Sequence, residues 1–217
     1  MSVLNTRGNI EVYAPAFGQP ADQYAVTQTT AANTMSTRVT VGRTGLTVCP
    51  RAPRSSTSKQ SGCFEGRAIP IDYIVRVPKQ ARVSLFTADG SIHVTDVFGP
   101  VEARVRQGDI KIQIPSYADA ATQYGNVTVM FGDAHWPGTL HFSAERGDVE
   151  VWVPATADAR VDLHADHGTI FTDFDLRGSS SHGSETIVGS IGHGGTHAID
   201  VRVTNGSIRL LKLTPQM

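Results

Sequence analysis

Short stretches of alternating apolar and polar residues run along most of the chain. A triplet of Gly, a small polar residue and Ile or Val recurs, and in most copies a second apolar residue follows two positions later. Alternation with a period of two is typical of a strand that buries one face. Each repeat therefore predicts a strand, a corner at the glycine and a second strand. The copies begin at Gly8, Gly90, Gly108, Gly125, Gly147, Gly168, Gly189 and Gly206.

From Gly90 onward these glycines are 17 to 22 residues apart, and a nearly constant period indicates a repeat architecture. Because every copy has the same phase, equivalent residues can stack from one coil to the next. We therefore predict an all-β, single-stranded parallel β-solenoid, right-handed like nearly all parallel crossovers. About seven regular coils are expected over 79–213, within one domain that spans 1–217. An antiparallel β-sandwich, which also has short alternating strands, is the alternative.

Two parts of the chain fit the repeat less well. Residues 1–78 contain one copy at Gly8 and further strand-like stretches with longer spacers. We expect a first coil at Gly8, and an irregular N-terminal layer from the rest that caps the solenoid and covers its strand edges. Upstream of Gly189, the Ser-rich segment 179–184 has no apolar alternation. The coil through Gly189 is accordingly predicted to be looser, with a protruding loop over 177–186.

Charge and hydropathy remove several classes of function. The chain has 217 residues, of which 18% are charged, and a formal net charge of −1. Nucleic acid is not expected as a partner, because phosphate binding needs a concentrated basic surface. No apolar run approaches the ~20 residues that a membrane span needs, and no secretory leader is visible. The protein is expected to be exported after removal of a leader, with a cytoplasmic location as the alternative.

The two cysteines bear on that choice. Cys49 and Cys63 flank a segment rich in Pro, Ser and Arg, which is typical of a loop. A disulfide across it would stabilise the fold by about 3 kcal/mol on the chain-entropy model. We predict this bridge and, with it, an oxidising compartment. Two unrelated buried thiols are the alternative.

The order of these features resembles the bacterial "putative adhesin" family of β-solenoid domains of unknown function. The matching features are an opening Asn5-x-x-Gly8-Asn9-Ile10-x-Val12, the stretch Ile74-Val75-Arg76-Val77-Pro78, and the train of glycine coils that follows. The resemblance spans essentially the whole chain. It implies an exported domain associated with the cell envelope, and it supplies no catalytic residues to carry over.

The histidines raise the question of a metal site. His164, His167, His182, His193 and His197 gather in the last quarter of the chain, without the tight spacing that makes ligands converge. We interpret them as surface residues of a polar, loop-rich end. If a site exists, His164 or His167 with His193 is the predicted pair. The calcium-binding β-roll repeat needs an Asp that is missing around Gly192, so no cofactor is expected.

Catalytic signatures are also missing from the sequence. No Gly-x-Ser-x-Gly elbow or phosphate-binding glycine loop is present. Asp109 and Asp148 share one repeat offset but should lie two coils, about 10 Å, apart, which is a little wide even for the carboxylates of an inverting glycosidase. They are predicted to be solvated corner residues, and the chain is predicted not to be an enzyme. A small polysaccharide-active β-helix enzyme is the alternative.

Three aromatic residues are the candidates for a binding surface. Trp152 stands one position away from inward-facing valines and should point outward, and Phe171 has the outward offset of Glu150. Trp136 lies in the extra length, 132–138, of the longest repeat. Together they predict an adhesin-like module that binds a glycan, an envelope polymer or a protein. A structural module that forms a homo-oligomer through the solenoid edges, without any ligand, is the alternative.

Overall fold

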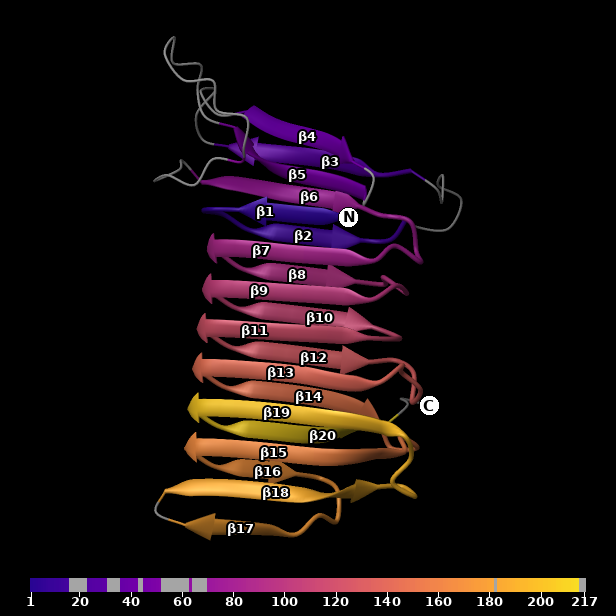
Figure 1. The fold of residues 1–217 in the computed structure, drawn as a ribbon, viewed down its shortest axis with the longest axis vertical. Coiled ribbons are helices and arrows are strands. Elements are labelled where there is room, and N and C mark those ends of the chain that lie inside the picture. Colours follow the sequence, from indigo (N-terminus) through magenta and orange to yellow (C-terminus); the bar gives the residue numbers. More distant parts are fainter. Residues whose placement is uncertain are drawn as a thin grey trace.

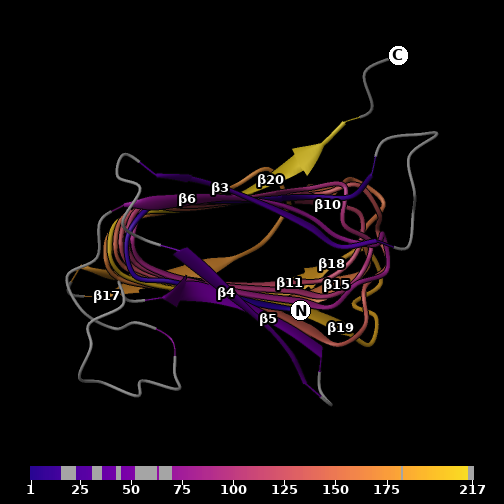
Figure 2. The same cartoon turned by 90° about the horizontal axis from the view of Figure 1, so that it is seen from above.

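The computed structural model describes residues 1–15, 23–30, 36–42, 45–51, 63, 70–181 and 183–214. Every regular element in these residues is a β-strand, so none of them forms an apolar helix that could span a bilayer. The strands make two sheets that pack face to face in a flattened rod (Figures 1 and 2). The chain is a parallel β-solenoid, as predicted, and the alternative of an antiparallel sandwich is wrong.

We call the lower end of the rod in Figure 1 the C-terminal end and the upper end the N-terminal end, and we give the strands of each sheet in that order. Sheet A contains, in this spatial order, β17 (Gly178–Ser181), β18 (Ser184–Ile191), β15 (Ala159–His167), β19 (His197–Asn205), β13 (Thr139–Arg146), β11 (Ala118–Tyr124), β9 (Val101–Gln107), β7 (Val83–Asp89), β1 (Ser2–Asn5), β5 (Gly45–Arg51) and β4 (Ser36–Gly42). Sheet B contains β16 (Ile170–Thr172), β20 (Ile208–Leu213), β14 (Val149–Pro154), β12 (Val127–Phe131), β10 (Ile110–Ile114), β8 (Ile92–Thr95), β2 (Ile10–Tyr13), β6 (Ile71–Arg76) and β3 (Ala25–Thr30).

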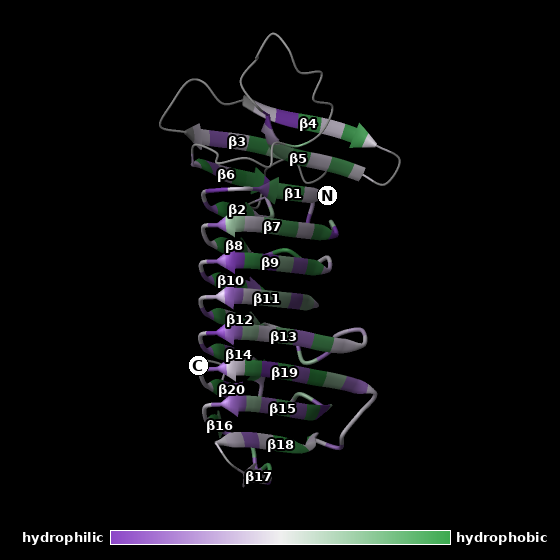
Figure 3. Ribbon diagram, turned by 60° about the vertical axis from the view of Figure 1, so that its left-hand side comes forward, coloured by the Kyte–Doolittle hydropathy of each residue, from purple (hydrophilic) through white to green (hydrophobic). Residues whose placement is uncertain are grey.

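One coil consists of a strand from each sheet, joined at a glycine corner. In Figure 1 the front strands of sheet A run to the left and the rear strands of sheet B run to the right while the chain descends, which is a right-handed coil. The apolar positions of each strand face the space between the sheets. Ile92, Ile110, Val127 and Val149, for example, are register partners in successive strands, and each is at most 1% exposed. Figure 3 shows this alternation of apolar and polar residues along the strands.

The corners explain both recurring features of the triplet. Gly125 has φ = 143°, and a Cβ there would lie 2.1 Å from the carbonyl oxygen of Gly108 in the adjoining coil. Only glycine therefore allows the coils to stack so closely. The next residue, small and polar, accepts a backbone N–H of the adjoining coil. The Oδ1 atoms of Asp109, Asn126 and Asp148 accept the amides of Asn126, Asp148 and Ser207 at 2.7, 2.9 and 2.7 Å. We call this row the corner ladder.

The coils do not follow sequence order at the C-terminal end, and here the predicted regular succession over 79–213 is wrong. β19 pairs with β13 on one side and β15 on the other, and β20 lies between β14 and β16. The last coil, yellow in Figure 1, is thus inserted between two earlier ones. The strands that precede this coil in the sequence lie at the end of the rod, where β18 pairs antiparallel with β15 and β17 pairs antiparallel with β18.

This end hairpin also corrects the prediction of a loose coil at Gly189. Gly189 lies inside β18 opposite Val161 and does not form a corner. The loop predicted over 177–186 is replaced mainly by the strands β17 and β18, and residue 182 lies outside the described residues. Although this segment has no regular apolar face, antiparallel pairing still provides hydrogen-bond partners for its backbone.

The N-terminal end has the same kind of arrangement. β1 lies between β5 and β7, and β2 lies between β6 and β8. The stretch at Gly8, which the sequence indicates as a first coil, forms a regular coil and lies inside the stack. Beyond it, the antiparallel strands β4 and β3 complete the two sheets. Each terminal coil of the chain is thus placed inside the stack; antiparallel strands end both sheets at the N-terminal end of the rod and sheet A at the other, where sheet B ends in the parallel strand β16.

Candidate functional site

The outer face of sheet A carries a row of connected depressions. Two of them have volumes of about 420 Å³ each, and a third of about 290 Å³ lies between them and shares lining residues with both. We call the whole the sheet A groove. Its lining includes Ser84, Phe86, Glu102, Arg104, Tyr117, Asp119, Ala121, His141, Ser143, Asp200 and Arg202.

Strand register places these side chains in two rows that run across the strands. The first row joins Ser84, Glu102, Asp119, His141 and Asp200, which are register partners on β7, β9, β11, β13 and β19. The second row lies two residues further along the same strands. It consists of Phe86, Arg104, Ala121, Ser143 and Arg202. Because neighbouring strands lie about 4.8 Å apart, each row offers a new side chain at that spacing along the rod.

The charges of the groove are paired with one another. Arg104 donates from Nε and Nη2 to Glu102 Oε1 at 3.2 and 3.0 Å, and its Nη2 lies 3.6 Å from Asp119 Oδ1. Arg202 makes the same kind of contact with the acid two residues before it, from Nε to Asp200 Oδ1 at 3.1 Å. The groove therefore presents fixed guanidinium and carboxylate groups without a large excess of either charge.

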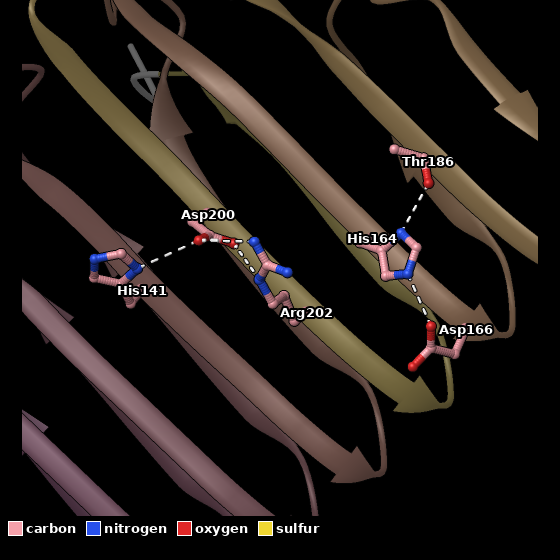
Figure 4. Close-up of polar contacts among 6 residues, drawn as sticks. All are labelled: His141, His164, Asp166, Thr186, Asp200 and Arg202. Atoms are coloured by element: carbon pink, nitrogen blue, oxygen red, sulfur yellow. Dashed lines mark hydrogen bonds and ion pairs between the residues drawn. The ribbon is translucent and has the colours of Figure 1, made fainter.

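A histidine of the groove contacts an acid of the neighbouring strand. His141 Nδ1 lies 3.5 Å from Asp200 Oδ2, as Figure 4 shows together with the contact between Asp200 and Arg202. On its other side, His141 is the register partner of Asp119. The acids of the first row thus make contacts between strands at two places, Asp119 on β11 with Arg104 on β9 and Asp200 on β19 with His141 on β13.

Two groups in the groove have shifted acidity. Burial raises the pKa of the Asp119 carboxyl, and the positive charges of Arg104 and His141 oppose that shift. Burial also raises the pKa of the Tyr117 phenol, with a further contribution from the negative charge of Asp119. Tyr117 therefore keeps its O–H as a donor at neutral pH, next to carboxylates that accept hydrogen bonds.

Between the two arginines the groove has a floor of small side chains. Ala121 and Ser143 stand between Arg104 and Arg202 in the second row, so that three strand spacings separate the two guanidinium-bearing residues. Both small residues are only partly buried, because nothing in the described chain covers them completely. This floor is the part of the groove that can receive a bulky ligand.

The predicted aromatic surface is only partly correct in geometry. Trp136 is 2% exposed and packs against the rings of Phe131 and His197, each at a centroid distance of 5.9 Å. The loop 132–138, which adds length to this repeat, places the indole in the core. The expectation that this indole is exposed is therefore wrong. Trp152 does point outward, and Phe171 is 57% exposed. Both lie on the outer face of sheet B, the face opposite the groove.

Trp152 is held by its own strand. Its Nε1 donates to Glu150 Oε1 at 2.7 Å, and Glu150 Oε2 lies 3.6 Å from Arg209 Nη1 on β20. Trp152 and Phe171 are separated by β20. These two residues keep the role of a candidate contact surface on sheet B, separate from the groove.

The structure places the histidines of the hypothetical metal pair apart. His164 binds Thr186 Oγ1 through Nδ1 and Asp166 Oδ1 through Nε2, both at 2.8 Å (Figure 4). His193 Nδ1 lies 3.9 Å from Asp158, just before β15 begins. His164 and His167 lie in the second half of that strand, six or more residues on, which is about 20 Å. Within the described residues, no three His, Cys, Asp or Glu side chains form a group that could hold a metal ion.

The carboxylates weighed as a catalytic pair have a structural role. Asp109 and Asp148 both belong to the corner ladder, with Asn126 between them. They lie at the corners and not in the groove. Each accepts a backbone amide of the next coil, so their oxygens stabilise the stack, as the interpretation as corner residues predicts.

The predicted disulfide is present between Cys49 and Cys63. Cys49 lies in the buried part of β5 and is 2% exposed. Most of the intervening segment that we expected to be a loop, 52–62, lies outside the described residues. The bridge ties Cys63 to β5, near the N-terminal end of sheet A.

The groove residues were not singled out from the sequence, although a signal for them exists. They stand six and four positions before the corner glycines. Aligned on those glycines, the repeats give acid-x-Arg at Glu102-Ala103-Arg104 and again at Asp200-Val201-Arg202. What the alignment does not contain is the insertion of β19 beside β13, which brings the second of these motifs to the groove.

Comparison with known proteins places the chain in a family. The Toastrack DUF4097 family matches residues 8–211, and the chain belongs to it. A search of the curated proteins gives no match. Among solved structures, the chain is similar to that of a "putative cell adhesion protein" from Clostridium sporogenes ATCC 15579, with a TM-score of 0.52 and 9% identity. The alignment covers 98% of this chain and 92% of the other. At this identity the similarity concerns the fold alone.

Proposed function

We propose that the chain is a non-catalytic recognition module that binds an uncharged, hydroxyl-rich glycan laid across the strands of sheet A. The observation that carries the proposal is the pair of side-chain rows, one polar and one of mixed character with two arginines, that repeats from strand to strand over connected depressions. A polymer that runs along the rod meets a new side chain of the same row about every 4.8 Å. A long ligand therefore gains contacts that a single sugar cannot.

The chemistry of the groove favours an uncharged glycan over a polyanion or a polycation. Sugar hydroxyls both donate and accept, so they can bind a guanidinium and a carboxylate that are already fixed side by side, as in Arg104 with Glu102. A charged polymer would have to compete with these internal pairs. The exposed ring of Phe86 and the partly buried ring of Tyr117 add apolar contact area for a sugar face.

A location outside the cytoplasm supports such a role. The disulfide between Cys49 and Cys63 is of the kind that persists in oxidising compartments. The similar structure from Clostridium sporogenes is that of a "putative cell adhesion protein". We therefore infer that the module acts in the cell envelope or at the cell surface.

The test is a pair of matched substitutions on the two outer faces. Ser143→Trp fills the floor of the groove between Arg104 and Arg202, and Thr128→Trp adds the same bulk to the outer face of sheet B. The purified, oxidised chain and both variants are titrated with a panel of neutral, acidic and basic polysaccharides. We expect saturable binding to a neutral polymer, weakened at least tenfold by Ser143→Trp and unchanged by Thr128→Trp.

Three results would count against the proposal. Binding that survives Ser143→Trp but is lost in Thr128→Trp or Trp152→Ala would move the site to the sheet B surface of Trp152 and Phe171. A steep fall in affinity between low and high salt would indicate a charged ligand. Release of reducing ends from any polysaccharide of the panel would show that the module is an enzyme.

One feature favours a second candidate, assembly through a strand edge. β4 ends sheet A, and its Val39 and Val41 are 52% and 81% exposed. At the other end of the rod, the Glu185 carboxylate accepts the Ile170 amide of the end strand β16 at 2.7 Å, which blunts that edge. Light scattering of the chain and of Val41→Lys distinguishes this candidate: a dimer abolished by the substitution, without glycan binding, would favour assembly.

A further inference from the structure

The coil formed by β19 and β20 lies in a slot between two coils that precede it in the sequence. β13 and β15 belong to consecutive coils in sequence, yet they do not pair, because each pairs with β19. In the same way β14 and β16 both pair with β20. Without residues 197–213, two parallel edges would face each other across a gap of one coil, about 10 Å from strand to strand.

The slot recognises a pattern that any copy of the chain supplies. The inward side chains of the inserted coil, including Ile199, Val201, Ile208 and Leu210, are fully buried. Its corner continues the corner ladder, since the amide of Ser207 donates to Asp148 Oδ1 at 2.7 Å. None of these contacts depends on the covalent link to the preceding hairpin. The same coil from a second molecule would make all of them.

The link itself is a short, glycine-rich hinge, 192–196. It begins after Ile191 and ends before His197, and these two residues are the partners of Ala159 on opposite sides of β15. The hinge therefore passes around the start of β15, where the Gly195 amide donates to Asp158 Oδ1 at 2.9 Å. Fully extended, its five residues span about 20 Å. A hinge that extends away from β15, instead of passing around it, would direct the coil out of its own slot and toward a slot in a second molecule.

We propose that the slot between β13/β14 and β15/β16 accepts the C-terminal coil of a second copy of this chain, giving a coil-exchanged dimer. This is an interaction beyond glycan recognition, and it differs from pairing at the outer edge β4. Monomer and dimer contain the same coil contacts, so they differ in the conformation of the hinge and in the entropy of association. The dimer is accordingly favoured by high protein concentration during folding.

A cysteine pair reports which molecule fills the slot. Thr139 and Ala198 are register partners on β13 and β19, within the Cα distance that a disulfide needs. After Thr139→Cys with Ala198→Cys, the engineered bridge lies within one chain in the monomer and between two chains in the exchanged dimer. A non-reducing gel separates the two. The matched control is Ala121→Cys with Ser143→Cys, on β11 and β13, which lie in consecutive coils and must bridge within one chain.

Shortening the hinge makes the test decisive. Deletion of His193, Gly194 and Gly195 leaves two residues, which span about 10 Å. That length equals the two strand spacings between Ile191 and His197 and leaves nothing to pass around β15. We expect the reporter pair to give mostly interchain bridges in the short-hinge chain. In the unshortened chain, the interchain fraction should rise at least threefold between dilute and concentrated refolding.

The proposal fails under either of two results. If the reporter bridge of the unshortened chain stays within one chain at every refolding concentration, the slot does not accept a second copy; this measurement stands even when the short-hinge chain does not fold. If the control pair gives interchain bridges to the same extent as the reporter pair, the dimers arise from unspecific oxidation. A separate measurement, light scattering under reducing conditions, shows whether the dimer persists without the engineered bridge, as coil exchange requires.

Discussion

Two neighbouring stretches of the chain contain the same three residues and fold differently. Gly206-Ser207-Ile208 forms a corner between β19 and β20, where Gly206 has φ = 148°. Gly189-Ser190-Ile191 lies entirely within β18 and pairs antiparallel with the start of β15. The difference lies in what precedes and adjoins each triplet. The buried core residues Val201 and Val203 stand five and three positions before Gly206, whereas the polar, half-buried Ser184 and Thr186 stand at those positions before Gly189.

The glycine triplet thus permits a corner but does not impose one. A corner forms where the glycine can stack on the glycine of an adjoining coil, as Gly206 stacks on Gly147. Where the positions three and five residues before the glycine are polar, as at Thr186 and Ser184, the same triplet continues as a strand at the end of the rod. We therefore expect the inserted coil to tolerate fewer substitutions than the end hairpin.

The largest difference in stability is expected between alanine substitutions of the two glycines. In Gly206→Ala the new Cβ would lie 2.1 Å from the carbonyl oxygen of Gly147, and the positive φ disfavours alanine as well. We expect a loss of more than ~4 kcal/mol in the free energy of unfolding. In Gly189→Ala the Cβ meets a methyl group of Leu176 at 2.9 Å, which can move, at a cost of about 1 kcal/mol. Urea unfolding of both variants measures this difference, and equal losses would show that the triplets are equivalent.

A second difference concerns the side chain that holds the inserted coil. Trp136 packs on His197, the first residue of β19. Trp136→Ala should therefore destabilise the chain by about 3 to 5 kcal/mol. Hydrogen exchange should accelerate first in β19 and β20. Trp152→Ala, on the outer face of sheet B, is the control and should cost much less. Faster exchange confined to β17 and β18 would contradict the assignment.

Substitutions of polar residues at the two triplets should differ less in the stability that they remove. Asp148 Oδ1 accepts the amide of Ser207 at the corner, so Asp148→Ala should cost about 2 kcal/mol. Asp148→Asn should restore most of this, because Asn126 makes the same contact one coil away. Ser190 is exposed and lies within a strand, so Ser190→Ala should change stability by less than ~0.5 kcal/mol. Thermal unfolding of the three variants tests this ranking of stability losses. An Asp148→Ala variant as stable as the unsubstituted chain would contradict it.

The smallest effect is expected at the hinge between the two regions. The hydrogen bond from the Gly195 amide holds the pKa of the Asp158 carboxyl below its usual value of 3.8. Because this folded-state pKa is depressed, the contribution of Asp158 is present above the ordinary Asp range and is lost as the pH falls through the lowered pKa. The amide resonance of Gly195 should titrate with a midpoint below 3.8. Asp158→Asn should abolish this titration, and a midpoint at or above 3.8 would refute the contact.

Much of the fold could be predicted from the sequence because it depends on local chemistry. The alternation of apolar residues defines the strands, and the glycines define the corners at Gly90, Gly108, Gly125 and Gly147. The outward direction of Trp152 follows from the same alternation. The burial of Trp136 could not be predicted this way, because a loop residue has no period and its partners Phe131 and His197 come from different coils.

The candidate site could be predicted even less. Glu102 and Arg104 stand in one strand, and their contact follows from their spacing. Their alignment with Asp200 and Arg202 requires that β19 lie beside β13. That neighbour is far away in the chain, and a parallel strand of the same pattern could have paired at either edge.

The repeats alone dictate a stack of two-strand coils with glycine corners, because the inward faces and the turns are properties of each repeat. The order of the coils, the antiparallel ends and hence the groove on sheet A arise only in the folded molecule. The physical reason is that all coils present nearly the same edges. Which coil fills a given slot is then set by the free energy of the whole stack, including the hairpins that end it.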